Sequence, residues 1–242
     1  MPKHYEDLRD EALGKLRTYM DSLDPIKGKK LAYWIEDYVR FLGKERTFCP
    51  SKLIRYKRGA IVKVHLGYRV GSEEGGLHYA VVMDRDNPIS SPVITVIPLT
   101  SVKTGTDLKR LHFTNVFMGN EVYSLLSSNF AAELRSARQR VKDIEEFSKN
   151  LSDAQDLYTL QQRTAEVNKQ ISYCERMKNE ASRMKQGSIA LVGQITTVSK
   201  IRIYDPMHHG DALSQVRISA PTLDLLDAKV QELFGPQSFE PK

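Results

Sequence analysis

The chain has 242 residues, of which 40% are hydrophobic and 27% charged, and this balance is ordinary for a globular protein and excludes a disordered or collagen-like chain. The formal net charge is +6, from 36 Lys and Arg against 30 Asp and Glu, a modest basic excess that favours a polyanionic partner without requiring one. The two cysteines, Cys49 and Cys174, exclude a disulfide framework and a CxxC motif, and no apolar run reaches the roughly 18 residues of a membrane span, so we expect a cytoplasmic protein without a membrane segment.

Residues 1–55 are predicted to form an N-terminal helical extension. Apolar residues recur at helical spacing from Tyr5 to Leu23, the sequence "DPIKG" breaks the pattern, and a second apolar stripe follows from Leu31 to Leu42. Such stripes normally face a core, so we expect both helices to be packed. The only tryptophan, Trp34, lies in the second stripe, where simple packing is its expected role.

Residues 56–119 change to the period of a β-sheet. The runs "GAIVKVHL", "LHYAVVM", "PVITVIPL" and "RLHFTNVFM" alternate or are rich in β-branched residues, and Gly, Asp, Asn, Pro and Ser separate them. The connections are too short for crossover helices, so the strands are expected to be antiparallel, in a small twisted sheet or barrel.

Residues 120–185 are predicted to form an inserted antiparallel helical hairpin. Apolar residues keep a three-and-four spacing on both sides of "LSDAQ", and no strand signal interrupts them. Ser152, followed three residues later by Gln155, has the pattern of a capping box, so we place the turn near Asn150. Because the hairpin is an insertion, replacement of residues 128–183 by a short link is expected to leave a folded β domain.

Residues 186–242 return to strands in "GSIALVGQITTVSKIRIY" and then end in a helix. Ser219 is a possible N-cap, Pro221 stands in the first turn, and Gly235 marks the end of the helix. The whole chain is therefore predicted to be α+β, with one antiparallel β domain built from residues 56–119 and 186–242 and interrupted by the hairpin.

Several linked motifs resemble the MazF/PemK family of toxin endoribonucleases. The matching parts occur in order: "KRGAIVKV", the "GSEEGG" loop, "SPVITVIPLTS" and "QITTVSKIR". They cover residues 57–100 and 187–203, whereas the first 55 residues and the hairpin lie outside the family's usual minimal chain. The resemblance implies an SH3-like antiparallel β-barrel with a C-terminal helix, usually a homodimer, and a cognate antitoxin protein as partner.

The resemblance also implies cleavage of single-stranded RNA without metal or other cofactor, by attack of a 2′-hydroxyl on the adjacent phosphate. Such chemistry needs proton transfer and stabilisation of charge on the phosphorane. Family members commonly have an arginine at the position of His78 and a threonine at that of Thr100. Histidine can take up or release a proton near neutral pH, which arginine cannot, so His78 and Thr100 are the predicted catalytic residues.

The same motifs supply the predicted RNA-binding residues. These are Ser72, Glu73, Gly75 and Gly76 in the loop, Ser101 on the third strand, and Gln194 and Thr197 in the last motif. The loop is expected to be a mobile flap whose glycines let backbone N–H groups approach phosphate. Some family members have an acidic residue just before the glutamine, where this chain has Gly193, so any acid or base role of that position falls elsewhere.

Two other signals and two other functions stay open. "LIRYKRG" interleaves Tyr56 with basic residues, as a nucleic-acid patch or a basic linker does, and "HHG" at residues 208–210 lacks a third metal ligand. The loss of the usual arginine also fits a non-catalytic toxin of the same architecture, the CcdB type, which binds and inhibits DNA gyrase. The third alternative is an inert adaptor that presents the helical hairpin.

Overall fold

The computed structural model describes residues 4–185 and 187–236 of the protein, and the chain divides into two compact units. One unit consists of Met1–Phe48 and Leu66–Gly76, and the other of Cys49–His65 and Leu77–Lys242. The domain boundaries predicted from the sequence, after residues 55, 119 and 185, stay a prediction.

The first unit contains the two predicted helices. Helix α1 is Tyr5–Ser22 and helix α2 is Pro25–Lys44. The Asp24 carboxylate caps α2 by accepting hydrogen bonds from the N–H groups of Ile26 (3.1 Å) and Lys27 (3.0 Å), and a proline at the first helical position needs no such acceptor. These bonds lower the pKa of Asp24. The break at "DPIKG" is therefore confirmed as a helix start.

The apolar stripe of α1 is exposed, so the expectation that it packs into a core is wrong. Tyr5 is 73% exposed, Leu8 55% and Tyr19 51%, and no residue of α1 is buried. In α2, Leu31 and Phe41 are buried, and the Trp34 indole lies 5.5 Å from the Tyr38 ring between ring centroids. Periodicity predicted the helices correctly, but it does not say whether an apolar face has a partner.

The second unit is built on a seven-stranded antiparallel sheet, as predicted. The strands are β1 (Ile61–His65), β2 (Leu77–Val82), β3 (Val93–Ser101), β4 (Asn115–Phe117), β5 (Ser188–Leu191), β6 (Thr196–Ser199) and β7 (Ile203–Asp205). Their order is β4-β5-β3-β2-β1-β7, and β6 also pairs with β3. The long β3 pairs with β2 along one edge and with β6 and then β5 along the other.

The α+β class and the antiparallel pairing are thereby confirmed. Within residues 4–185 and 187–236, β4 pairs only with β5 and β7 only with β1, so strand pairing alone does not join the two ends of the sheet into a closed barrel. The predicted SH3-like closure stays a prediction.

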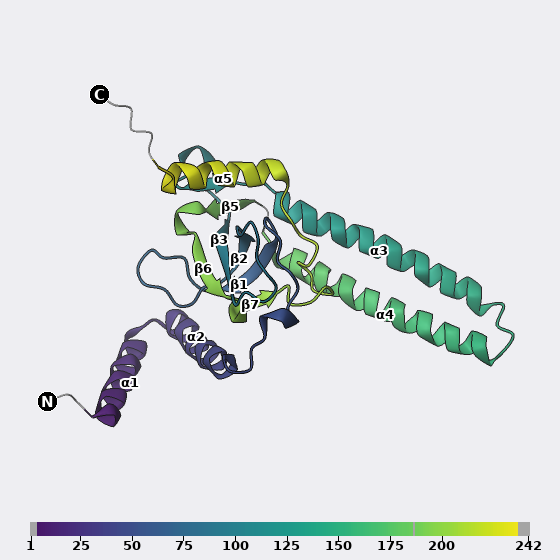
Figure 1. Ribbon diagram of the computed structural model, residues 1–242, viewed down its shortest axis with the longest axis horizontal. Helices are drawn as coiled ribbons and strands as arrows, with labels where there is room; N and C mark the ends of the chain where they lie inside the picture. Colours follow the sequence, from purple (N-terminus) through teal and green to yellow (C-terminus); the bar gives the residue numbers. More distant parts are fainter. Residues whose placement is uncertain (1–3, 186, 237–242) are drawn as a thin grey trace. The chain divides into compact units, whose positions relative to one another are not determined.

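The inserted segment forms the predicted hairpin of two long helices, α3 (Glu121–Ser148) and α4 (Ala154–Arg183), which lie side by side (Figure 1). The Gln170 amide donates to the Glu133 carboxylate at 3.0 Å across the pair. The cap of α4 is Asp153, whose carboxylate accepts from the Asp156 N–H at 2.8 Å. The capping box predicted for Ser152 and Gln155 is therefore wrong by one residue, because Asp is as good an N-cap as Ser.

The base of the hairpin belongs to the core of the sheet. Ile61, Val81 and Ile97 of the strands are fully buried, and they share one hydrophobic cluster with Leu126 of α3 and Met177 of α4, also fully buried. Because a core packs at nearly crystalline density, removing the Met177 side chain opens a cavity rather than trimming a surface. Replacement of residues 128–183 therefore cuts into the core, contrary to our expectation.

Helix α5 (Ala220–Phe234) follows the last strand, and its start is as predicted. The Ser219 hydroxyl accepts from the Thr222 N–H, Pro221 lies in the first turn, and Gly235 is the C-cap. Leu226 buries its side chain in the same hydrophobic cluster. Four short 3₁₀-helices complete the described chain: Pro50–Lys52, Leu108–Arg110, Val192–Gln194 and Lys200–Arg202.

Candidate active site

His78 lies in β2 opposite Val64 of β1, and its side chain is half-buried. Its Nδ1 is 3.1 Å from the main-chain oxygen of Leu99 in β3. A carbonyl oxygen can only accept, so Nδ1 carries the proton in this bond. In the neutral ring the lone pair is then on Nε2, which is the nitrogen able to take up a proton.

Thr100 and Ser101 lie at the end of β3 and line a cavity of about 90 Å³. Thr100 is opposite Ile189 and Ser101 opposite Ser188 of β5. The other lining residues are Tyr79, Leu99, Val122, Arg183, Met184, Lys185 and Ser188. The structure thus brings two predicted site residues together with two cationic side chains from the end of the hairpin.

Strand alternation separates His78 from this cavity. Successive side chains in a strand point to opposite faces, so His78 is directed away from the face of its neighbour Tyr79, which lines the cavity. The last ladder pair of β2 and β3 is Ala80 with Pro98. His78 and Thr100 each stand two residues beyond that pair, so they lie at equivalent positions on neighbouring strands.

The predicted flap lies in the first unit and is folded at its base. Leu66 N–H donates to Gly76 O, and Gly76 N–H donates to Gly67 O, both at 2.7 Å. A side chain at Gly75 would place its Cβ 2.8 Å from Gly67 O, and one at Gly67 would place it 3.2 Å from the Trp34 indole. These two glycines are thus required by the chain's own packing.

Two polar residues of the loop are open to solvent. Ser72 and Glu73 are exposed, and Glu73 lies 3.5 Å from the Arg69 guanidinium. Both residues belong to the first unit, whereas His78 and Thr100 belong to the second. Their part in RNA binding therefore stays a proposal.

The motif "QITTVSKIR" has an exposed part and a packed part. Thr197 of β6 is exposed, and its hydroxyl lies 3.1 Å from that of Thr95. Gln194 is half-buried at the end of a 3₁₀-helix. A Cβ at the preceding Gly193 would lie 2.9 Å from the Thr114 Cβ, so a carboxylate fits there only if Thr114 moves.

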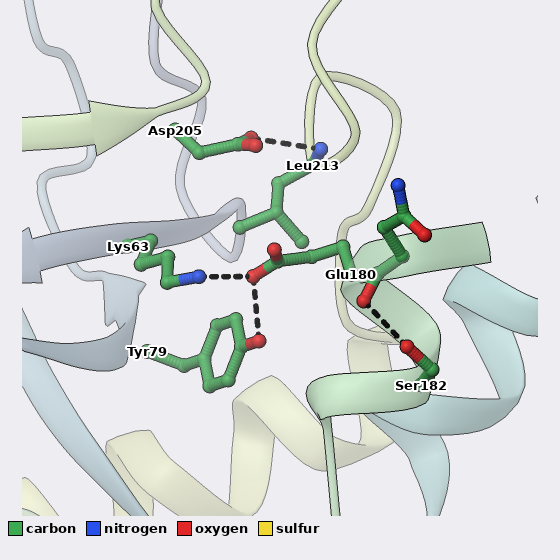
Figure 2. Close-up of polar contacts among 7 residues, drawn as sticks. Lys63, Tyr79, Glu180, Ser182, Asp205 and Leu213 are labelled. Atoms are coloured by element: carbon green, nitrogen blue, oxygen red, sulfur yellow. Dashed lines mark hydrogen bonds and ion pairs between the residues drawn. The ribbon is translucent and has the colours of Figure 1, made fainter. Parts of the chain in front are cut away.

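A buried polar network ties α4 to the strand that carries His78 (Figure 2). Glu180 is almost fully buried, and one of its oxygens accepts from both the Lys63 ammonium and the Tyr79 hydroxyl, each at 2.6 Å. Burial, together with the hydrogen bond to Glu180, raises the pKa of Tyr79 well above its usual range, so this phenol stays a donor. Tyr79 is the direct neighbour of His78, so the network fixes β2 on one side of the histidine.

Asp205 lies beside this network, opposite Lys63 in the β1–β7 ladder. Burial raises its pKa to about 6, and the negative charges of Asp211 and Glu180 act in the same direction. The Leu213 N–H, which donates to the carboxylate at 2.9 Å, and the Lys63 charge partly oppose the rise.

The basic tract "LIRYKRG" offers no aromatic platform for a nucleic-acid base. Tyr56 is 2% exposed and its hydroxyl donates to Pro206 O at 2.7 Å. Over residues 4–185 and 187–236, no group of three His, Cys, Asp or Glu side chains is arranged to hold a metal ion, and no helix is long and apolar enough to cross a membrane.

Sequence reasoning missed Arg183, Lys185 and Glu180. All three lie in a segment that looks like a solvated helix with mixed charges, and only the pairing of β3 with β5 brings that segment's end to Thr100 and Ser101. The available signal was position, because Arg183 and Lys185 stand within four residues before "GSIAL", where the β domain resumes.

A comparison with models of protein families finds one match. The sequence model of the PemK-like, MazF-like toxins of type II toxin-antitoxin systems matches residues 57–140, which run from β1 into α3. Among solved structures, the crystal structure of MazF (Form-I) from Deinococcus radiodurans is 12% identical, covers 76% of this chain and 99% of its own, and has a TM-score of 0.36. A TM-score this low carries no argument by itself. No curated protein matches the chain.

Members of this family are generally endoribonucleases that pair with antitoxins and usually form dimers. The match begins two residues before Gly59 and includes the loop, His78, Thr100 and Ser101. Over residues 57–140 the chain is therefore similar to the PemK-like, MazF-like toxins of type II toxin-antitoxin systems.

Proposed function

We propose that the protein is an endoribonuclease that cleaves single-stranded RNA by attack of a 2′-hydroxyl on the adjacent phosphate, without a divalent metal ion. The observation that carries the proposal is the hydrogen bond from His78 Nδ1 to Leu99 O at 3.1 Å. This bond orients the imidazole and selects its tautomer, which is what a carboxylate or carbonyl does for a general base in many enzymes.

His78 is proposed to act as the general base. Its Nε2 takes the proton of the 2′-hydroxyl while the 2′-oxygen bonds to phosphorus. The bond from phosphorus to the 5′-oxygen then breaks, and that oxygen takes a proton from water. The products are a 2′,3′-cyclic phosphate and a free 5′-hydroxyl, so atoms and charge balance without an oxidant or reductant. Removing a general base typically slows such a step by about 10²–10⁴-fold.

Thr100 is proposed to stabilise the charge that develops on the non-bridging phosphate oxygens. Its hydroxyl is a donor, and Thr100 is paired with Ile189 of β5, so its backbone is positioned before the reaction starts. A preorganised donor of this kind contributes more than a flexible one, because it needs no reorganisation in the transition state.

The remaining predicted residues are proposed to bind the RNA. Ser72, Glu73, Gly75 and Gly76 would contact the strand from the loop, and Ser101, Gln194 and Thr197 from the sheet. The exposed hydroxyl of Thr197 supports a contact, because the side chain is open to solvent. A cognate antitoxin and a second copy of the chain are the proposed protein partners, on the strength of the family.

The test is cleavage of a mixed-sequence single-stranded RNA in EDTA by the full chain and by His78→Ala. His208→Ala is the matched control, since it removes an exposed histidine from the loop after β7. We expect the wild type and the control to cut and to leave 2′,3′-cyclic phosphate ends, and His78→Ala to lose at least about 10²-fold in rate. Equal rates in all three proteins would remove His78 from the mechanism.

The resemblance implies an arginine at the position of His78, and the change to histidine keeps two alternatives in the test. If wild-type protein cuts no RNA and instead inhibits DNA gyrase, the chain is a binding toxin of the same fold. If it does neither, the adaptor alternative, in which the sheet presents the hairpin, is favoured.

A further inference from the structure

We infer that the end of the inserted hairpin builds a phosphate-binding pocket, in which Arg183 and Lys185 hold a phosphodiester of the RNA next to the one that reacts. The inference rests on the proposed function, since the ligand is a single-stranded RNA backbone. It assigns to the hairpin a direct part in substrate binding.

The two cations are available for a ligand. Arg183 is the last residue of α4, and Lys185 follows it by two positions. Both side chains are exposed, and neither has an ion pair or a side-chain hydrogen bond with any residue in the described part of the chain. Both line the cavity of about 90 Å³ that also contains Ser101 and Ser188.

Glu180, the acid closest before Arg183 in α4, does not cancel their charge. Glu180 lies one helical turn before Arg183, and its carboxylate already binds the Lys63 ammonium and the Tyr79 hydroxyl. The partial negative charge at the C-terminus of a helix is about half an elementary charge, less than either cation alone. The pocket therefore presents a net positive charge to an incoming anion.

Neutral donors complete the pocket. Ser101 and Ser188 are directly opposite each other in the β3–β5 ladder, so their side chains stand on the same face of the sheet. Arginine offers up to five N–H donors in a fork that matches two phosphate oxygens, lysine offers three, and each serine hydroxyl adds one. This donor set suits a phosphodiester, which has acceptors only.

The protein also fixes where the cations stand. Glu180 anchors the last turn of α4 to the sheet, and Met177, a turn earlier, is fully buried. Past the cations, Gly187 has a φ of +80°, and a Cβ there would lie 2.7 Å from the Val102 side chain. The last turn of α4 and Gly187 are therefore both held by their packing, which reduces the entropy lost when an anion binds.

The position of the pocket indicates which phosphate of the RNA binds there. Thr100 borders the cavity, whereas His78 is directed to the other face of β2. His78 is not among the residues that line the cavity. An RNA strand whose reacting phosphate lies at His78 and Thr100 would carry a neighbouring phosphate to Arg183 and Lys185.

The test measures how RNA affinity depends on salt. A mixed-sequence RNA that is 2′-O-methylated throughout cannot react, so its binding can be followed by fluorescence anisotropy from about 50 to 200 mM salt. The test protein is Arg183→Gln/Lys185→Gln, and the control is Lys169→Gln/Lys178→Gln, which removes the same charge from exposed positions of α4 outside the cavity. Circular dichroism verifies the fold of both.

We expect the test protein to reduce the slope of log affinity against log salt by about 0.7, because the pocket holds one phosphate and each phosphate contact on a single strand contributes about 0.7. The control should change the slope by much less. If the wild type cuts RNA and the two variants have equal slopes, the pocket is refuted and the proposed function stands. If the wild type neither binds nor cuts RNA, both fall.

Discussion

Glu180→Ala tests whether the buried network between α4 and the sheet holds the hairpin in place. The side chain of Glu180 is 8% exposed and that of Lys63 is 18% exposed, and their charged atoms are 2.6 Å apart. Removing the carboxylate leaves the half-buried Lys63 ammonium and Tyr79 hydroxyl without their shared acceptor. Most of the lost free energy of unfolding comes from leaving a charge without its partner away from water, and less from the lost attraction itself.

Breaking one partner of a buried ion pair costs about 3–5 kcal/mol. For a unit of 150–250 residues, each kcal/mol lowers the melting temperature by about 2–4 °C, so Glu180→Ala is expected to melt about 6–20 °C below the wild type. The double variant Lys63→Met/Glu180→Met removes both charges and replaces them with side chains of similar volume. Such replacements are often neutral or stabilising, so it should melt close to the wild type.

Thermal unfolding followed by circular dichroism measures these differences, with Glu175→Ala as a control for loss of an exposed acid from the same helix. The same variants also report on function, because Arg183 stands one turn after Glu180. Glu180→Ala is expected to weaken RNA binding at a temperature where it is still folded. A melting temperature within about 2 °C of the wild type for Glu180→Ala would refute the reasoning.

Three further predictions concern other parts of the molecule. The raised pKa of Asp205, about 6, means that the folded state holds the carboxyl proton more tightly than the unfolded state does. The stability of the wild type should therefore fall relative to Asp205→Asn as the pH rises from about 4 through about 6. Urea unfolding should show a loss of at most about 3 kcal/mol. Gly67→Ala places a side chain at a φ of +99° and 3.2 Å from Trp34, so hydrogen exchange in α2 and the loop should accelerate, by the equivalent of about 1–3 kcal/mol. Replacing residues 140–163 with a short Gly/Ser link should leave a cooperative thermal transition, whereas replacing residues 128–183 should abolish it, because the longer cut removes buried side chains of α4.

Local patterns in the sequence predicted the elements well, because their causes are local. The period of two located β1 to β3, and the cap at Ser219 followed from side-chain chemistry within one turn. The start of α4 was wrong by one residue, since both Ser152 and Asp153 are suitable caps and only the backbone geometry selects between them. The exposed stripe of α1 shows the limit of periodicity, which reveals an apolar face but not its partner.

The candidate site could be predicted only in part, because its residues come from segments far apart in sequence. His78, Thr100 and Ser101 were found through linked motifs, and the structure adds the bond that selects the tautomer of His78. Lys63 and Glu180 are separated by 117 residues, and no local pattern marks them as partners. The place of Arg183 beside Thr100 could not be predicted for the same reason, since it depends on how the chain runs from α4 into β5.

The measurement that tests the central proposal most directly uses one modified nucleotide. Once a cleaved bond has been located in a single-stranded RNA, the same oligonucleotide is prepared with a 2′-deoxy sugar immediately 5′ of the scissile phosphate, and both are incubated with the protein in EDTA. If the substrate's own 2′-hydroxyl is the nucleophile and His78 removes its proton, the RNA is cut and the deoxy oligonucleotide is bound but stays intact. Cleavage of the deoxy oligonucleotide at that bond would contradict the mechanism.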